Sequence, residues 1–271
     1  MNPDDLALLE AARRGEPDAL DQLIRRYQAQ VYRFGMKMCR DPEDAKDVLQ
    51  DTLLALARGV RDFRGTSSVS TWLYSVARSF CIKKRRMPKS APGPQRSLES
   101  DAAKEVARVA DSTQLPDEVL AEKRIEQAIE QAIGALEPMY REVLILRDIE
   151  GLTAAEVAEV LGTSVDAVKS RLHRARVAVR AHVAPLLGVP LAAASPNCPD
   201  VVQLFSQYLE GEIAPDVCTK LEAHLATCPR CRAACDSLKQ TLALCRAAPA
   251  PLPSDVQESV RSAVQRFVAG G

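Results

Sequence analysis

The chain has 271 residues, and its 36 lysine and arginine residues balance its 36 aspartate and glutamate residues. This length allows two or three small domains, and the zero net charge excludes any inference about partners from total charge. No apolar run is long enough to cross a membrane and no signal peptide opens the chain, so we expect a cytoplasmic protein without a membrane partner. Helical periodicity prevails throughout and no stretch alternates as a strand would, which predicts an all-α fold.

Proline-rich stretches divide the chain into several parts. We expect two small helical domains joined by a flexible linker, followed by a small helical domain rich in cysteine. The parts are an N-terminal block (residues 1–87), a linker (88–116), a middle block (117–187), a second linker (188–197), a cysteine block (198–245) and a C-terminal tail (246–271). The tail combines a proline-rich break with a short amphipathic helix.

The N-terminal block contains a helix with a predicted acidic face. Asp41-Pro42-Glu43-Asp44 places acidic residues at the start of this helix, where the helix dipole favours them. Helical spacing predicts a buried stripe made of Val48, Leu49, Thr52, Leu53 and Leu56. The residues left exposed are Asp44, Asp47, Gln50 and Asp51. On spacing alone, this face is either an ordinary solvated surface or a surface that docks another protein.

The next predicted helix, residues 71–86, combines aromatic residues with a cationic end. Five cations and no acid lie between Trp72 and Arg86. Aromatic and cationic side chains together suit single-stranded or melted DNA, which they bind through stacking and charge. The candidate DNA contacts are Trp72, Arg78, Lys84, Arg85 and Arg86. Trp72 and Phe80 also fit the protein core, and we favour the core for Trp72.

Residues 150–176 of the middle block carry the most informative pattern in the chain. Thr153 and Glu156 form a capping box that starts one helix, Gly162 supplies a turn, and Ser164 caps a second helix. This is the layout of a helix-turn-helix, in which the second helix enters the major groove of DNA. Its candidate DNA contacts are Lys169, Ser170, Arg171, His173, Arg174 and Arg176. A basic helix is often only a solvated surface, but the caps and the turn favour DNA binding.

The cysteine block has the composition of a metal site. Six of the eight cysteines lie between Cys198 and Cys245, which scattered core cysteines would not produce. His224 and Cys228 are four residues apart and project from one helix face. Cys228 and Cys231 have the spacing of two thiolates that hold one tetrahedral ion, and Cys198 could supply a fourth ligand.

Two further thiols, Cys218 and Cys235, are additional candidate ligands. Surplus thiols favour a site that exchanges ligands, binds a soft ion such as copper or cadmium, or forms disulfides. The alternatives are a static zinc staple in a domain too small to fold alone, and a redox switch that closes a disulfide between Cys228 and Cys231. We assign the remaining cysteines to packing or to no role: Cys39, Cys81 and Cys245.

Several segments together resemble a sigma factor of the extracytoplasmic-function (ECF) group. The resemblance covers roughly residues 5–86 and 117–183. Its segments are Asp44–Thr52, Phe63-Arg64-Gly65, Thr71–Tyr74, Ala77-Arg78, Leu136–Leu144 and Val168–Arg176. The resemblance implies that the acidic face of Asp44, Asp47, Gln50 and Asp51 docks on core RNA polymerase. It also implies that the N-terminal block melts and reads the −10 element of promoter DNA, and that the middle block reads the −35 element.

The sequence departs from this family at three positions. Ser79 stands where the family usually has asparagine, and Lys83 stands where an acidic residue is common. Both lie in the segment expected to read the −10 element, so melting efficiency and −10 preference do not follow from the resemblance. Asp166 replaces a frequent glycine in the −35 helix, which is a smaller departure.

The cysteine block resembles the zinc-binding anti-sigma fold at Cys198, His224, Cys228 and Cys231. A sigma factor that carries such a block resembles the CorE-type, metal-responsive subgroup. This implies a transcription factor whose own metal-binding domain sets its activity, with no separate anti-sigma factor required. The alternatives are a sigma factor with a structural or redox-active tail, and a helix-turn-helix regulator that does not join polymerase. With three histidines and no recognisable set of nucleophile, base and oxyanion donors, neither an enzyme nor a small-molecule substrate is expected.

Overall fold

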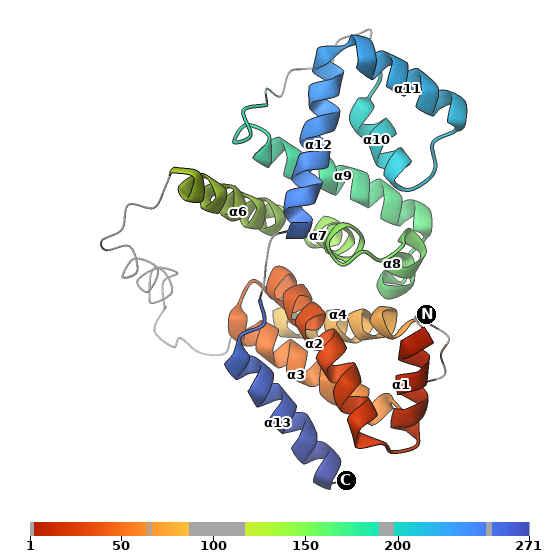
Figure 1. Ribbon diagram of the computed structural model, residues 1–271, viewed down its shortest axis with the longest axis vertical. Coiled ribbons are helices and arrows are strands. Elements are labelled where there is room, and N and C mark those ends of the chain that lie inside the picture. The colour runs from red at the N-terminus through yellow and green to blue at the C-terminus, as the bar shows by residue number, and fades with distance from the viewer. Residues whose placement is uncertain are drawn as a thin grey trace.

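The computed structural model describes residues 3–63, 65, 67–86, 117–189, 198–247 and 251–270. Every regular element within these ranges is a helix, which confirms the predicted all-α fold (Figure 1). The linker predicted at 88–116 and most of the one at 188–197 lie outside the described residues.

The N-terminal block is a bundle of four helices. They are α1 (Pro3–Arg13), α2 (Pro17–Cys39), α3 (Pro42–Gly59) and α4 (Val69–Arg86). Asp41 caps α3, because its side chain accepts hydrogen bonds from the backbone N–H groups of Glu43 and Asp44. The whole apolar stripe predicted for this helix is buried: Val48, Leu49, Thr52, Leu53 and Leu56.

The middle block contains the predicted helix-turn-helix. Its elements are α6 (Asp117–Ala135), α7 (Pro138–Leu144), the single π-helical turn η1 (Ile145–Ile149), α8 (Ala154–Leu161) and α9 (Val165–Val183). Both hydrogen bonds of the capping box between Thr153 and Glu156 are present. Gly162 ends α8 with φ of +62°, and the Ser164 hydroxyl accepts from the backbone N–H of Ala167 at the start of α9.

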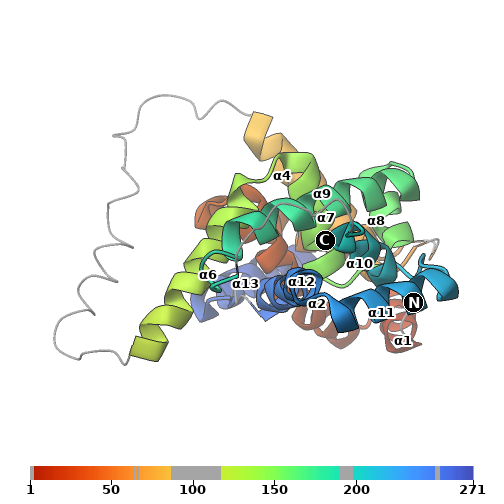
Figure 2. The ribbon, with the colours of Figure 1, turned by 90° about the horizontal axis from the view of Figure 1, so that it is seen from above.

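The C-terminal part reaches back over both blocks. The cysteine block is made of α10 (Val201–Leu209), α11 (Pro215–Thr227) and α12 (Pro229–Ala247), and the tail forms α13 (Ser254–Gly270). Helix α12 crosses α9, whereas α13 lies on the N-terminal bundle beside α3 (Figure 1). Viewed from above, α10 and α12 again lie next to α9 (Figure 2).

One continuous apolar core joins the N-terminal block, the middle block and α13. The tail enters this core through three buried valines one turn apart: Val256, Val260 and Val264. At its edge, Arg261 donates to both carboxylate oxygens of Asp21, at 2.9 and 3.1 Å. The cysteine block has only two small apolar clusters of its own. The three helices of the cysteine block therefore depend less on their own apolar packing, and more on other kinds of contact, than the helices of the N-terminal bundle do.

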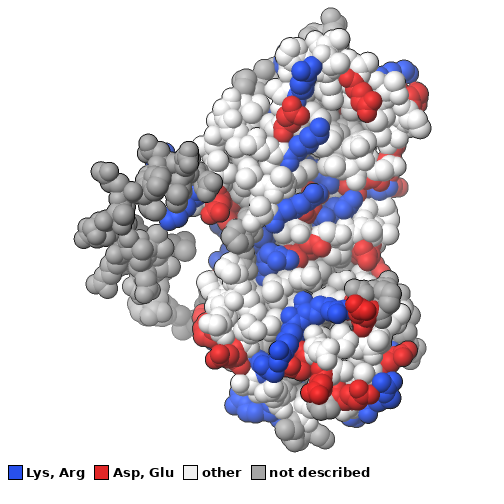
Figure 3. Space-filling model, in the orientation of Figure 1, with Lys and Arg blue, Asp and Glu red and all other residues white. Residues whose placement is uncertain are grey.

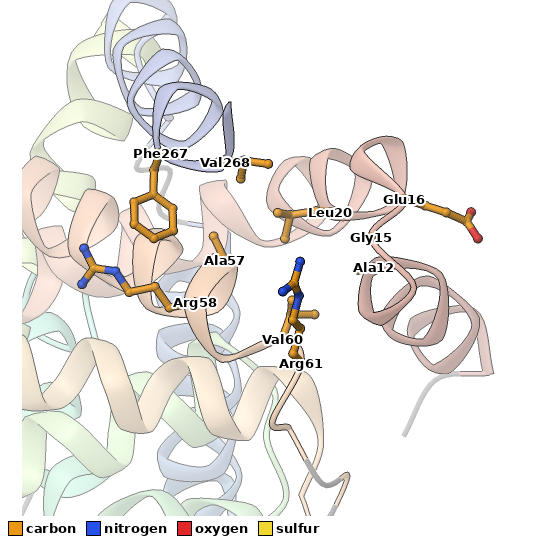
Figure 4. A pocket seen from close by; sticks show the side chains of 10 residues that line it. All are labelled: Ala12, Gly15, Glu16, Leu20, Ala57, Arg58, Val60, Arg61, Phe267 and Val268. Atoms are coloured by element: carbon orange, nitrogen blue, oxygen red, sulfur yellow. The ribbon is translucent and has the colours of Figure 1, made fainter. Parts of the chain in front are cut away.

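Helix α13 leaves a groove where it crosses the N-terminal bundle. At its far end the Phe267 ring lies against the guanidinium of Arg58 in α3, 4.8 Å from ring centroid to Cζ (Figure 4). The groove beside this contact has a volume of about 350 Å³ and is lined by α1, α2, α3 and α13. The tail is thus held near the middle of α13 by an ion pair to α2, and near its C-terminal end by a cation–π contact to α3.

Candidate DNA-binding helix and metal centre

Helix α9, the predicted recognition helix, faces the cysteine block. Lys169 forms an ion pair with Glu212, which lies in the turn between α10 and α11. Ser170, His173 and Arg174 line a groove of about 320 Å³ together with residues of α10. Arg174 is exposed and donates to the Tyr140 hydroxyl at 3.2 Å, whereas Arg171 is half-buried. Part of the predicted DNA-facing surface is therefore covered by the chain itself.

Arg176 does not point outward, and this expectation was wrong. The residue is 1% exposed, and its guanidinium donates to both oxygens of Asp148, at 2.9 and 2.7 Å. It also donates to Glu210 and to the Ser206 hydroxyl, each at 2.8 Å. Burial lowers the pKa of Arg176, but the hydrogen bonds and charges of Asp148 and Glu210 outweigh burial and raise it.

The physical reason lies in helical spacing. Arg176 follows Leu172 by four residues and precedes Val179 by three, and both neighbours are fully buried. It therefore belongs to the inward face of α9. This spacing was visible in the sequence, whereas the acidic partners Asp148 and Glu210 could be recognised only from the fold.

Three cations of α4 are paired with acidic residues of the same chain. Arg78 donates to Glu142 of α7 at 3.0 Å, and Arg85 lies 3.6 Å from the same carboxylate. Lys84 pairs with Asp44 at 3.8 Å and with Asp47. Two candidate DNA contacts thus meet the middle block, and a third meets two candidate polymerase contacts.

The remaining candidate contact residues of the N-terminal block are Gln50, Asp51, Trp72 and Arg86. Gln50 and Asp51 are half-buried on α3, and the side chain of Arg86 lies outside what the structure describes. Trp72 is half-buried and packs edge-to-face on Phe63, with ring centroids 6.0 Å apart. The structure therefore favours the core interpretation of Trp72.

Long-range ion pairs hold the N-terminal and middle blocks together. We call the contacts of Glu150 with Arg33 and Tyr74 the clasp. Glu150 accepts two hydrogen bonds from Arg33, both at 2.6 Å, and a third from the Tyr74 hydroxyl at 2.8 Å. Lys37 pairs with Glu130 at 2.7 Å. Figure 3 shows cationic and acidic side chains interleaved across the middle of the molecule, where the two blocks meet. No sequence pattern predicted these contacts, because the partners are about a hundred residues apart in the chain.

The four predicted metal ligands come together in space. The ligand atoms of Cys198, His224, Cys228 and Cys231 all lie within 4.8 Å of one another, and two of the sulfurs, those of Cys198 and Cys228, are 4.0 Å apart. Cys198 precedes α10, His224 lies in the last turn of α11, and Cys231 lies in the first turn of α12. One bound ion would therefore tie together all three helices of the cysteine block.

The donor set fits a tetrahedral zinc-type ion. The Nε2 atom of His224 is buried without a hydrogen-bond partner among the described residues, as expected for an imidazole awaiting a metal. The backbone N–H of Cys231 lowers the pKa of Cys228, which favours its thiolate. Burial raises the pKa of Cys231 to about 12, so metal binding would have to displace its proton.

The other cysteines lie outside this cluster. Cys218 and Cys235 do not join the four ligands; they line a separate apolar pocket of about 360 Å³, where Cys218 lies 3.8 Å from Glu222. Cys81 and Cys245 are fully buried, which agrees with the packing roles expected for them. The Cys39 sulfur lies 3.1 Å from that of Cys81, between α2 and α4.

Comparison with known proteins gives three family matches. Residues 23–89 match the sigma-70 region 2 family, residues 126–179 match sigma-70 region 4, and residues 198–232 match a zinc-finger family. The ECF RNA polymerase sigma factor SigM of Mycobacterium tuberculosis (strain ATCC 25618 / H37Rv) is 34% identical over 184 residues, covering 68% of this chain and 85% of SigM. The match to both sigma regions argues against a helix-turn-helix regulator outside this family.

Two solved structures are similar in part. CnrH, solved with the cytosolic domain of CnrY, is 27% identical with a TM-score of 0.47, covering 66% of this chain and 96% of that one. RpoE of Bartonella quintana is 20% identical with a TM-score of 0.44, covering 62% and 96%. RpoE was solved with the anti-sigma factor NepR. Within the described residues, no helix is both long and apolar enough to cross a membrane.

Proposed function

We propose that this chain, which belongs to the ECF group of sigma-70 transcription initiation factors, is controlled by metal binding to its own cysteine block. The observation that carries the proposal is that the cysteine block and α13 together contact both sigma regions. Helix α12 packs on α9 and η1, while α13 packs on α3. In this closed form the cysteine block covers part of the α9 surface expected to meet promoter DNA, including Lys169.

The contacts of the cysteine block with the middle block support this control. Arg180 of α9 donates to the Ser237 hydroxyl of α12 at 2.6 Å, and Arg246 of α12 donates to the Asp148 carbonyl at 2.9 Å. Arg147 of η1 donates to Glu210 at 2.9 Å. These polar contacts need α10 and α12 in fixed relative positions, because each helix supplies different partners.

The metal would supply that fixed arrangement. A block with two small apolar clusters has little buried area to hold three helices together, so a bound ion would contribute much of its stability. We infer that the metal-loaded block stays docked on α9, and that loss or exchange of the metal loosens it. A zinc ion suits the three cysteines and one histidine, and softer cadmium or copper ions would compete for the thiolates.

Transcription in vitro tests this proposal. Run-off transcripts from a cognate promoter would be measured with core RNA polymerase while zinc, cadmium or copper is titrated against chelated protein. We expect zinc to lower the transcript yield, and Cys228→Ser to abolish the effect of zinc. Cys218→Ser is the matched control, because Cys218 lies in the same block but outside the ligand cluster. An equal yield under all conditions would refute metal control.

A further inference from the structure

We infer that the turn Glu210-Gly211-Glu212 between α10 and α11 places the Glu212 carboxylate where a promoter phosphate would bind Lys169 of α9, so that DNA and the cysteine block compete for this cation. We call these three residues the acidic turn. The inference rests on the proposed function and adds the contact by which docking and DNA binding exclude each other.

The first observation is the pairing of the acidic turn with cations of the helix-turn-helix. Glu212 pairs with Lys169 near the start of α9. Glu210, whose side chain is 5% exposed, accepts from Arg176 at 2.8 Å and from Arg147 at 2.9 Å. The Glu212 carboxylate thus takes the place on Lys169 that a phosphate oxygen takes on basic helices in protein–DNA complexes, while Glu210 anchors the turn on the inward-facing Arg176.

The second observation is the spacing of the cations. Lys169 and Arg176 are seven residues apart on α9, which is about 10 Å along the helix axis. Gly211 has φ of +70°, a left-handed conformation that glycine adopts without strain. This tight turn lets Glu210 and Glu212 reach two cations that are two helical turns apart.

The third observation is that the acidic turn leaves part of the polar surface of α9 open. Ser170, His173 and Arg174 line an open groove beside the acidic turn, and Arg174 is exposed. A duplex can therefore reach Arg174 before the acidic turn has left. Arg176 would retain its two hydrogen bonds to Asp148 after release, so the middle block would not be left with an unpaired buried charge.

Glu212→Gln tests this inference in the full-length, zinc-loaded chain. The probe is a fluorescent DNA duplex of mixed sequence and about 20 base pairs, because phosphate contacts do not depend on sequence. We expect Glu212→Gln to tighten duplex binding about threefold, since it removes one partly exposed ion pair. Glu210→Gln should also tighten duplex binding, because it weakens the docking of the acidic turn on Arg147 and Arg176; Arg176 itself stays paired with Asp148.

Glu258→Gln is the control, because Glu258 is exposed on α13 and the substitution changes the net charge equally. Equal duplex affinity in Glu212→Gln, Glu258→Gln and the unaltered chain would overturn the inference. If metal still controlled transcription in that case, the proposed function would stand and docking would act elsewhere. If instead Glu212→Gln tightened binding while metal had no effect on transcription, the competition would stand and metal control would fail.

Discussion

The clasp between the two sigma regions can be tested at Glu150. Its side chain is 1% exposed and accepts two hydrogen bonds from Arg33 and one from Tyr74. A hydrogen bond to a charged group contributes about 1.5–3 kcal/mol. Because Arg33 is 28% exposed and partly screened by solvent, we expect the pair to contribute about 2–3 kcal/mol in total.

A double-mutant cycle in urea measures this quantity. The free energy of unfolding would be compared for the unaltered chain, Glu150→Gln, Arg33→Gln and the double variant. One apolar core runs through both blocks, so loss of the clasp should destabilise the chain as a unit. Glu126→Gln, at an exposed position of α6, is the control for the change in charge. A coupling energy below about 0.5 kcal/mol, the level found for residues that do not touch, would refute the clasp.

Three further predictions concern the buried groups. Arg176→Met should lower the free energy of unfolding by about 3–5 kcal/mol, because it leaves the fully buried Asp148 without its main partner; urea denaturation would show this. Val260→Ala should cost about 1–3 kcal/mol and speed proteolysis of α13, whereas the exposed Ser262→Ala should behave as the unaltered chain. Burial raises the pKa of Cys245 from 9.0 to about 12, so the unfolded chain ionises first as the pH rises. Stability should therefore fall by about 1.4 kcal/mol per pH unit between these values, and Cys245→Ala should remove that part of the slope in a pH series of unfolding curves.

Local patterns predicted the elements that depend on neighbours in sequence. The capping box of Thr153 and Glu156, the turn at Gly162 and the cap at Ser164 follow from interactions within four residues. The spacing of His224, Cys228 and Cys231 also made the metal cluster predictable, because thiolate and imidazole ligands recur at narrow spacings. The choice of Cys198 over the nearer Cys218 as fourth ligand came from the resemblance to the zinc-binding anti-sigma fold.

Contacts between distant segments were not predictable in the same way. A chain with many acidic residues offers each lysine or arginine many possible partners. Only the fold determines that Arg33 pairs with Glu150 and that Lys169 pairs with Glu212. The docking of α13 on α3 likewise depends on the fit of two apolar faces, and an amphipathic pattern alone does not name its partner. The DNA-contacting and polymerase-contacting roles of individual residues stay predictions.

The π-helical turn η1 contacts three parts of the molecule. Within it and at its end, Arg147 reaches the cysteine block, Asp148 reaches α9, and Glu150 reaches the N-terminal block. Successive residues of a helical turn point in different directions, so this one short turn can contact three neighbouring parts. Shortening this turn by one residue would rotate Glu150 away from Arg33 while leaving Asp148 in place. The length of this turn therefore sets the relative alignment of all three parts, independently of how strongly any one pair binds.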